Sequence, residues 1–361
     1  MGLSRLTRYL LRELLGAWLA VTIVLLVVLL TNRLIQFMAD AASGEIPAGV
    51  IFTLLGLKAA ANLGVVLPGS FFLGAVLALA RLYRDSEVTA MAGCGIGPLQ
   101  LYRGVFSLAL PLAFAVGLLT LSVGPAAERV ADRVLVNAQQ QAQFAGVRPG
   151  RFTALGPDST VYVTQVSDSG EMQGVFIERQ LPGGDEVWIA DRGRRAVNAL
   201  GAGEFLVLES GWRYAGEPGA GAWQLMRYAT QGVRISEPEP IDPNTGLDAR
   251  SLSALLDQAD TQSLAELQTR LSFPVMVLIL ALGSLPLART DPRQGRYAQV
   301  VTAVLLFMVY FNVLYTAQDW LASGQTPAWL GLVWVHAVAA VITVVALRRR
   351  FSLGWRTGRS A

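Results

Sequence analysis

Reactive side chains are scarce in this sequence. Its 361 residues include one cysteine (Cys94), one histidine (His336) and one lysine (Lys58). A single cysteine excludes an internal disulfide, and one cysteine with one histidine cannot supply a structural zinc site. A histidine-based catalytic triad would have to use His336, which lies inside an apolar run. We therefore expect no metal site and no hydrolase chemistry, and we interpret Cys94 as a packed residue and His336 as a hydrogen-bonded packing residue.

The sequence also lacks the loop that binds nucleotide phosphates in many ATPases. That loop needs a lysine followed by serine or threonine, and the only lysine, Lys58, is followed by Ala59. We therefore expect no ATP, magnesium or other cofactor in this chain, and we predict that it is not an enzyme.

Charge is scarce as well. Charged residues make up 15% of the chain and hydrophobic residues 53%, whereas about a quarter of the residues are charged in a soluble domain. The mean hydropathy is +0.45. Several runs carry no charge, and about 18 such residues suffice to span a bilayer. The composition indicates an α-helical integral membrane protein.

Six runs are candidates for transmembrane helices: 14–32, 46–80, 104–127, 271–288, 297–318 and 320–347. The second would be roughly 50 Å long as a helix, so we expect it to tilt or to project beyond the bilayer, with a kink at Pro68. The first run is too long for a signal peptide and lacks a small-x-small cleavage site, so we interpret it as a retained helix.

The arginines predict the orientation. Basic residues are concentrated before residue 14, between 81 and 103, between 289 and 296, and after 347, whereas the alternate connections carry few of them. Short cytoplasmic loops are enriched in arginine and lysine. With six spans, both termini and both basic loops are therefore predicted to be cytoplasmic, and residues 128–270 to be external.

The external segment changes period along its length. Residues 128–147 continue the helical pattern, whereas from Arg151 short segments alternate between polar and apolar residues and are separated by turns. This pattern is typical of an all-β sandwich or jelly roll. We predict three parts: residues 1–127 with three spans, 128–247 with the inserted β-domain, and 248–361 with three more spans. No repeat relates the two halves, which weakens the interpretation as an inverted-repeat transporter.

Five basic residues are predicted near the external end of the spans and are candidate contacts for an anionic lipid: Arg33, Lys58, Arg129, Arg133 and Arg270. A charge inside a membrane segment suggests function. Two interpretations stay open. The cations could form a rim that binds phosphates or carboxylates, or they could snorkel or form internal ion pairs, such as Glu266 with Arg270 at i,i+4.

A short polar segment, "RLYRDSEVTAMAGCG" (81–95), lies between two apolar spans on the predicted cytoplasmic side. Asp85 is expected to cap a helix over 85–93, with Glu87 in its first turn and Gly93 or Gly95 at its end. Val88, Met91 and Ala92 follow at i, i+3 and i+4 and would form one apolar face. The segment is either a docking element for a partner or a turn that joins two spans.

Six motifs carry a resemblance to a known family: "RYLLRE" (8–13), "GEIPA" (44–48), "LPGSFFLG" (67–74), "RLYRDSEVTAMAGCG" (81–95), "AELQTRLSFP" (265–274) and "DPRQGR" (291–296). On these residues the chain resembles the LptF/LptG permeases of lipopolysaccharide export along almost its whole length, and the LptF branch more closely. Gly69 and Gly93 depart from the family pattern.

The resemblance implies a specific machine. It implies six spans, a periplasmic β-jelly roll after the third, and a location in the Gram-negative inner membrane. The partners it implies are an LptB ATPase dimer that binds ATP and magnesium, the LptG permease, the jelly-roll protein LptC and lipopolysaccharide as substrate; no nucleic acid is expected. It implies ATPase coupling through Glu87, with Asp85, Val88 and Met91 around it, and contact between the basic rim and the lipid, foremost through Arg33.

Three alternatives stay open. Within the family, the chain could be the LptG subunit. From other classes, it could be a lipoprotein-releasing type of ABC permease, which has four spans and a large domain after the first, or a membrane scaffold that moves no lipid.

Overall fold

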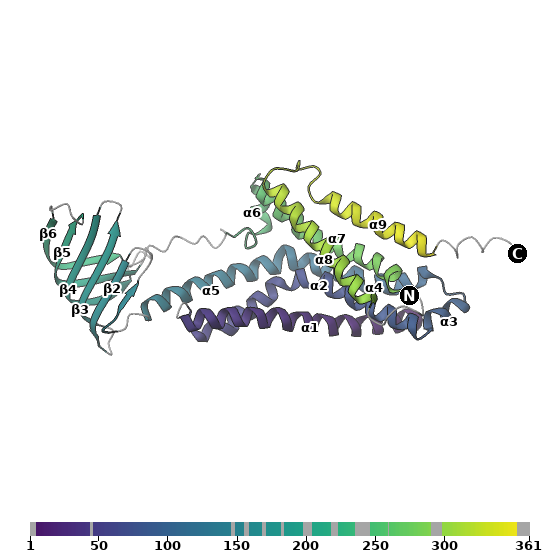
Figure 1. Cartoon of the computed structure of the whole chain (residues 1–361), viewed down its shortest axis with the longest axis horizontal. Coiled ribbons are helices and arrows are strands. Elements are labelled where there is room, and N and C mark those ends of the chain that lie inside the picture. Colours follow the sequence, from purple (N-terminus) through teal and green to yellow (C-terminus); the bar gives the residue numbers. More distant parts are fainter. Residues whose placement is uncertain are drawn as a thin grey trace. The chain divides into compact units, whose positions relative to one another are not determined.

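The computed structural model describes residues 5–43, 46–145, 149–154, 159–167, 171–181, 184–197, 204–217, 223–234, 246–258, 260–289 and 298–351. The chain divides into two compact units (Figure 1). The helical unit comprises residues 1–35, 52–133 and 243–361, and the β unit comprises 36–51 and 134–242. The motif "DPRQGR" (291–296) lies outside the described residues.

Nine α-helices are described: α1 Arg5–Ser43, α2 Ile51–Arg84, α3 Glu87–Gly93, α4 Pro98–Leu118, α5 Gly124–Ala145, α6 Leu252–Asp257, α7 Thr261–Ala288, α8 Ala298–Ala322 and α9 Val333–Phe351. A short 3-10 helix, η1, covers Ala48–Val50 before α2. Helix α2 continues through Pro68. The predicted helical continuation of the third span is confirmed by α5.

Five of the described helical stretches are long and apolar enough to cross a membrane: Arg5–Ser43, Ala48–Arg84, Pro98–Gln139, Thr261–Ala288 and Gln299–Ala322. They correspond to the first five predicted spans. The molecule is therefore a helical membrane protein with an inserted β-domain, as the sequence predicts.

The boundaries of the sixth predicted span, 320–347, are wrong. Helix α8 extends to Ala322 and ends in a Schellman turn, in which Gln325 N donates to Trp320 O at 2.8 Å and Gly324 N to Leu321 O at 3.1 Å. Gly324 has a φ of 75°, which glycine adopts without steric cost. Helix α9 begins only at Val333 and has three arginines in its last turn, so its apolar part is about 22 Å long.

The helical unit contains two apolar cores that share α2 and α7. The first joins α1, α2, α3, α4 and α7 around Phe71, Val105 and Leu285, all of which are fully buried. The second joins α2 and α7 to α8 and α9 around Val76, Met276 and Leu314. Helices α2 and α7 therefore form the centre of this unit, and each of the other spanning helices packs on one side of them.

A π-helical turn, η2 (Leu119–Val123), connects α4 to α5. Pro125 follows it and has no N–H to donate, so the ordinary i→i−4 pattern cannot continue through this point. The Thr120 hydroxyl in the turn lies 3.0 Å from the carbonyl oxygens of both Val116 and Arg270, which share its one hydrogen. The irregular turn thus ties the third span to α7.

The β unit contains one antiparallel sheet of six strands: β1 Phe152–Ala154, β2 Ser159–Val166, β3 Met172–Leu181, β4 Gly184–Val197, β5 Glu204–Gly216 and β6 Trp223–Arg234. The predicted all-β domain is confirmed. Its strands follow one another in the order of the sequence, so the described strands form a meander without the crossover connections of a jelly roll.

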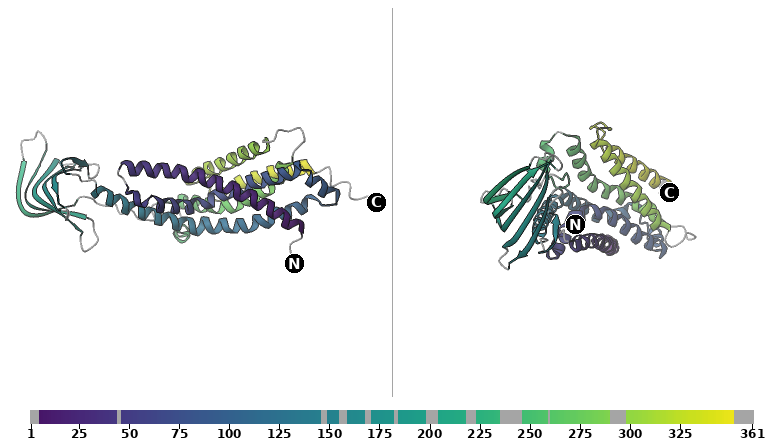
Figure 2. Two further views of the ribbon diagram at one scale, coloured as in Figure 1. Left: turned by 90° about the horizontal axis from the view of Figure 1, so that it is seen from below. Right: turned by 60° about the vertical axis from the view of Figure 1, so that its left-hand side comes forward.

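A crease crosses this sheet. In each pair of neighbouring strands from β2 to β6, the pairing skips one position. The skipped residues lie opposite one another and form a row across the sheet: Thr164, Gly174, Asp191, Ser210 and Ala229. Regular pairing continues beside the row, for example between Val163 and Val175 and between Glu209 and Thr230. Gly174 and Ser210 have φ values of 62° and 56°. The alternation of buried residues shifts by one position at the row: on β4, Trp188 and Ala190 are buried before it and Gly193 after it. Figure 2 shows the strands bending along their length.

The bend gives a single sheet its own apolar core. Buried side chains from β2 to β6 pack together on one face, among them Val163, Ile177, Trp188 and Leu208. On the other face, Ile189 and Trp212 stay more than two fifths exposed. A flat sheet could not bury one face against itself, so the crease replaces the second sheet of a sandwich.

Candidate functional site

Helix α3 begins at Glu87, two residues later than the sequence predicts. Its N-cap is Ser86, in the left-handed region with a φ of 59°, and no side chain caps the helix. Asp85 N donates to Arg81 O at 2.9 Å, and the Asp85 carboxylate lies 3.5 Å from Arg81 Nε. The predicted capping role of Asp85 is therefore wrong, because the carboxylate turns back toward α2.

The end of α3 is a second Schellman turn. Ile96 N donates to Met91 O, and Gly95 N to Ala92 O, each at 3.0 Å. Gly95 takes the left-handed conformation with a φ of 81°, as glycine does at this position. The prediction that Gly93 or Gly95 ends the helix is confirmed. The prediction for Cys94 is wrong: its side chain is exposed, since it follows the helix at this turn.

The apolar face of α3 packs on its own chain. Val88 is 7% exposed and belongs to the core of α1, α2, α4 and α7, and Met91 packs against the same core. Val88 therefore faces the interior of its own chain, and the coupling role that the resemblance implies for Val88 and Met91 stays a prediction. The exposed residues of this segment include Thr89, Ala90 and Ala92, together with Leu99 at the start of α4, which is 69% exposed. Sequence reasoning missed Leu99, because one apolar residue outside the helical period gives no signal.

Glu87 has a partner within the chain. The Tyr9 hydroxyl of α1 donates to Glu87 Oε2 at 2.7 Å. Arg81 of α2 lies 3.1 Å from a carboxylate oxygen of Glu13, also in α1. Two polar contacts therefore join the first turns of α1 to the segment around α3. The contact of Tyr9 spans 78 residues of sequence, and no spacing rule predicts it.

Lys58 lies at the other end of α2 and forms an ion pair with α5. Its Nζ is 2.6 Å from Glu128 Oε1 and 3.7 Å from Asp132 Oδ1. Lys58 and Glu128 are 18% and 14% exposed. Gly124, Glu128 and Asp132 lie at i, i+4 and i+8 on one face of α5. A Cβ at Gly124 would lie 3.2 Å from Ala61 O, so this glycine permits the close approach that brings Glu128 to Lys58.

Arg270 is an internal structural residue. It is 4% exposed, and its Nε lies 2.7 Å from Glu266 Oε1. Its other nitrogens donate to three backbone carbonyls, of Leu247 (2.8 Å), Asp248 (3.0 Å) and Arg250 (2.8 Å). The predicted i,i+4 pair is confirmed. Arg270 holds the turn before α6 against α7, so a buried guanidinium with four partners is not available to the predicted rim.

The other three cations differ in exposure. Arg129 is half-buried and donates to Ala249 O at 2.7 Å, which adds a second tie between α5 and the 246–250 turn. Arg33 and Arg133 have exposed side chains. Of the five predicted lipid contacts, Lys58, Arg129 and Arg270 therefore form bonds within the chain. Only the bond of Arg270 could be predicted from sequence spacing.

His336 bridges α7 and α8. Its Nδ1 lies 2.7 Å from the Tyr310 hydroxyl and its Nε2 lies 2.8 Å from Ser272 Oγ. The prediction of a hydrogen-bonded packing residue is confirmed. Among the residues that the structure describes, no group of three or more His, Cys, Asp or Glu side chains could hold a metal ion.

Comparison with known proteins decides the family. The sequence profile described as lipopolysaccharide export system permease LptF/LptG matches residues 8–349. The chain belongs to the LptF/LptG family. It is 27% identical to the lipopolysaccharide export system permease protein LptF of Escherichia coli strain K12 over 342 residues. The aligned region covers 94% of this chain and 93% of the relative. The LptF of Shigella flexneri matches with the same identity and coverage. Members of the LptF/LptG family are transporter subunits, so this chain is a multi-pass inner-membrane permease.

Proposed function

We propose that this chain is the LptF-type permease subunit of an ABC transporter that extracts lipopolysaccharide from the inner membrane and passes it to a periplasmic bridge. The observation that carries the proposal is the family match over residues 8–349. The LptF assignment is supported by the identity to LptF of Escherichia coli over most of both chains. Because the chain lacks a phosphate-binding loop, a separate ATPase must supply the energy and bind ATP and magnesium.

The proposed orientation places α3 and the last turn of α9 in the cytoplasm and the β unit in the periplasm. Arg81 and Arg84 end α2, and Arg348, Arg349 and Arg350 end α9. Arginines at these ends are what the positive-inside rule requires of cytoplasmic segments.

We infer that an LptB ATPase binds the exposed side of the segment around α3. Glu87 supplies the charge, and Ala90 and Leu99 supply small and apolar surface. Val88 and Met91 act indirectly, because they anchor α3 to the core of the permease. A helix fixed in this way transmits a displacement to α2 and α4 instead of rolling on the surface. Asp85, held by Arg81, sets the turn before Glu87.

The lipid contacts are proposed for the exposed cations, Arg33 and Arg133. Their guanidinium groups suit the phosphates of lipopolysaccharide, because arginine binds phosphate with two parallel hydrogen bonds. Lys58 can join them only when Glu128 and Asp132 release it. A phosphate that approached Lys58 would compete with two carboxylates for one ammonium.

The β unit would continue the path beyond the membrane. Strands β1 and β6 are the two edges of the sheet, and an edge strand can pair with a strand of another protein. Leu225 and Met226 on β6 are 60% and 43% exposed. We propose that one edge pairs with the jelly-roll protein LptC and that the partner permease in the membrane is LptG.

A purification experiment separates this proposal from its alternatives. The full chain is expressed with its genomic neighbours, purified in mild detergent, and its partners and bound lipid are identified by mass spectrometry. The proposal expects an LptB-type ATPase, an LptG-type permease and lipopolysaccharide. Recovery with an LptF-type permease instead would indicate the LptG role. An ATPase of the lipoprotein-releasing class, or no ATPase at all, would contradict the export function.

The role of Glu87 is tested with a matched pair of variants. We expect Glu87→Ala to lower recovery of the ATPase with the permease and to stop lipid release, because the charge on the docking surface is lost. Thr89→Ala changes an exposed residue of the same helix and should retain both. Normal ATPase recovery and lipid release in Glu87→Ala would show that the carboxylate does not couple the subunits.

A further inference from the structure

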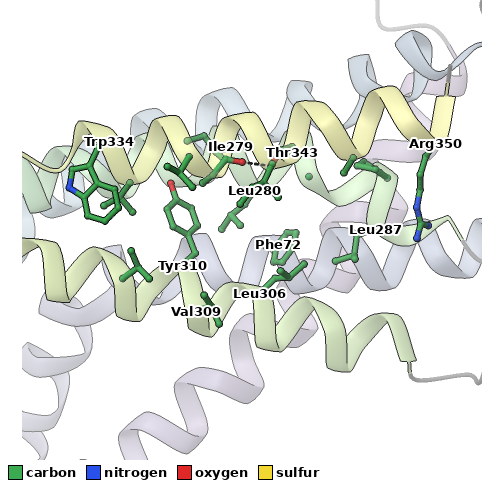
Figure 3. Close-up of a pocket in the computed structure, with 18 residues that line it drawn as sticks. Phe72, Ile279, Leu280, Leu287, Leu306, Val309, Tyr310, Trp334, Thr343 and Arg350 are labelled. Carbon is green, nitrogen blue, oxygen red and sulfur yellow. Dashed lines mark hydrogen bonds between the residues drawn. The ribbon is translucent and has the colours of Figure 1, made fainter. Parts of the chain in front are cut away.

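A cavity of about 280 Å³ lies among α2, α7, α8 and α9 (Figure 3). Phe72 and Leu280 form part of its buried wall, at 3% and 7% exposed. Val309 and Ile342 line it from α8 and α9 and are 61% and 60% exposed. The cavity is therefore closed toward the centre of the helical unit and has exposed apolar side chains along its outer edges.

Small residues make the cavity possible. Gly283 of α7 lines it together with Ala339 and Ala346 of α9. A Cβ at Gly283 would touch Thr343 at 3.6 Å, which is an ordinary contact distance. A larger side chain at Gly283 would extend into the space between α7 and α9. The cavity exists because these positions carry little or no side chain.

Two polar groups of the lining, the hydroxyls of Tyr310 and Thr343, already have partners. The Tyr310 hydroxyl is hydrogen-bonded to His336, and the Thr343 hydroxyl donates to Ala339 O at 2.8 Å. Neither needs a hydrogen bond from a ligand. The part of a ligand that enters this space must therefore be apolar.

One end of the cavity is charged. Figure 3 shows Arg350 and Trp334 at opposite ends of the lining. Arg350 Nη1 donates to Arg289 O at 2.7 Å, which holds its guanidinium at the end of α9, and a guanidinium carries five N–H donors, so one such bond does not exhaust it. Arg348 and Arg349 precede it in the same turn. The ligand that fits has an apolar tail toward Trp334 and an anionic group at Arg350.

We propose that this cavity binds one acyl chain of a membrane phospholipid whose anionic headgroup contacts Arg350. This site goes beyond the proposed export function and does not depend on it. The cavity is near the lower limit of about 300 Å³ for small-molecule sites, so it accommodates one chain and not the many chains of a lipopolysaccharide. Basic pockets between transmembrane helices are known to hold anionic lipid headgroups.

Photocrosslinking tests the site in the full chain. The protein, in nanodiscs with the subunits that co-purify with it, is labelled with phosphatidylglycerol or phosphatidylcholine carrying a diazirine in one acyl chain. Adducts are mapped by mass spectrometry. We expect adducts within 279–287, 306–313 and 334–346, with a preference of about five-fold for phosphatidylglycerol, the ratio expected from one favourable arginine contact.

Two variants separate tail from headgroup. Gly283→Leu should remove the adducts of both lipids from these segments, because the side chain fills the cavity. Arg350→Gln should keep the adducts but abolish the preference for phosphatidylglycerol, whereas Arg349→Gln, which changes an arginine outside the lining, should preserve it.

Two results would overturn the site. The first is equal labelling in wild type and Gly283→Leu. The second is occupation of the cavity by a helix of a partner subunit, seen as protein–protein crosslinks to Val309 or Ile342 in place of lipid. Export activity is measured in parallel, so that loss of the lipid site and failure of the export proposal are read independently.

Discussion

The Tyr9 hydroxyl of α1 donates a hydrogen bond of 2.7 Å to Glu87 Oε2 of α3. This bond joins the first transmembrane helix directly to the carboxylate proposed to bind the ATPase. An arginine of another protein that binds both oxygens of this carboxylate would share Oε2 with Tyr9 or displace the tyrosine. Partner docking and the position of α1 are therefore linked through one side chain.

Replacing Tyr9 with phenylalanine should strengthen ATPase docking. The change removes a competitor for Glu87 and leaves the aromatic ring in place. A hydrogen bond to a charged group contributes about 1.5–3 kcal/mol when well formed, and partial exposure here reduces that value, so a gain of up to about ten-fold in affinity is expected. Binding of the purified ATPase to the permease measures it. Weaker binding would mean that Tyr9 holds Glu87 in the docking geometry.

Replacing Lys58 with methionine should destabilise the helical unit. The change leaves Glu128 and Asp132 beside each other without their shared cation. Loss of one partner of a buried pair costs about 3–5 kcal/mol, and partial exposure reduces this to about 1–3 kcal/mol. Thermal unfolding in detergent measures the loss. Adding Glu128→Gln to Lys58→Met should recover part of it, and an unchanged midpoint in Lys58→Met would show that the pair is not stabilising.

Replacing Arg270 with lysine should loosen the segment 246–258. An ammonium cannot reach Glu266 and three carbonyls at once as the planar guanidinium does, so buried acceptors lose their donors at about 1–3 kcal/mol each. We expect faster proteolysis within 246–258 and a lower unfolding temperature. Leu256→Ala, which shortens a side chain of the same segment that is 64% exposed, is the control. Equal proteolysis of Arg270→Lys and wild type would contradict this role.

Replacing Gly211 with alanine should destabilise the β unit. A Cβ there would lie 2.1 Å from Ile189 O and 2.4 Å from the Tyr228 hydroxyl. Burial raises the pKa of Tyr228 to about 12, so this hydroxyl stays protonated and donates to Ile189 O at 3.0 Å. Overpacking of this kind costs about 1–3 kcal/mol. Limited proteolysis of the β unit in the full chain should accelerate, whereas Gln224→Ala on the exposed edge strand should not change it.

The membrane class and the inserted β-domain could be predicted because both depend on local pattern. Five apolar runs of sufficient length became long helices in the described structure, since a bilayer core imposes the same length on each of them. The alternation of polar and apolar residues from Arg151 onward predicted strands, because successive side chains of a strand point to opposite faces of a sheet. The absence of a phosphate-binding loop of this type could also be inferred locally, from the residue that follows Lys58.

Contacts between distant segments could not be predicted in this way. Five basic residues were predicted alike, yet Arg270 is buried among carbonyls, Lys58 pairs with two acids, Arg129 donates to a carbonyl oxygen, and Arg33 and Arg133 stay exposed. Val88 faces inward, to the core of its own chain. Its spacing could not predict this, because apolar residues at i, i+3 and i+4 show that a helix has an apolar face but do not show what covers that face.

The sequence by itself therefore determined five segments that are long and apolar enough to cross a membrane and the segment that forms strands. Only the tertiary structure decided that Glu87 is bound by Tyr9, that the sheet bends at a row of five residues, and that α7, α8 and α9 leave a cavity ending at Arg350. The physical reason is range. Hydropathy and periodicity act over one helix or strand, whereas partners such as Tyr9 and Glu87 meet only when elements separated by many residues pack together.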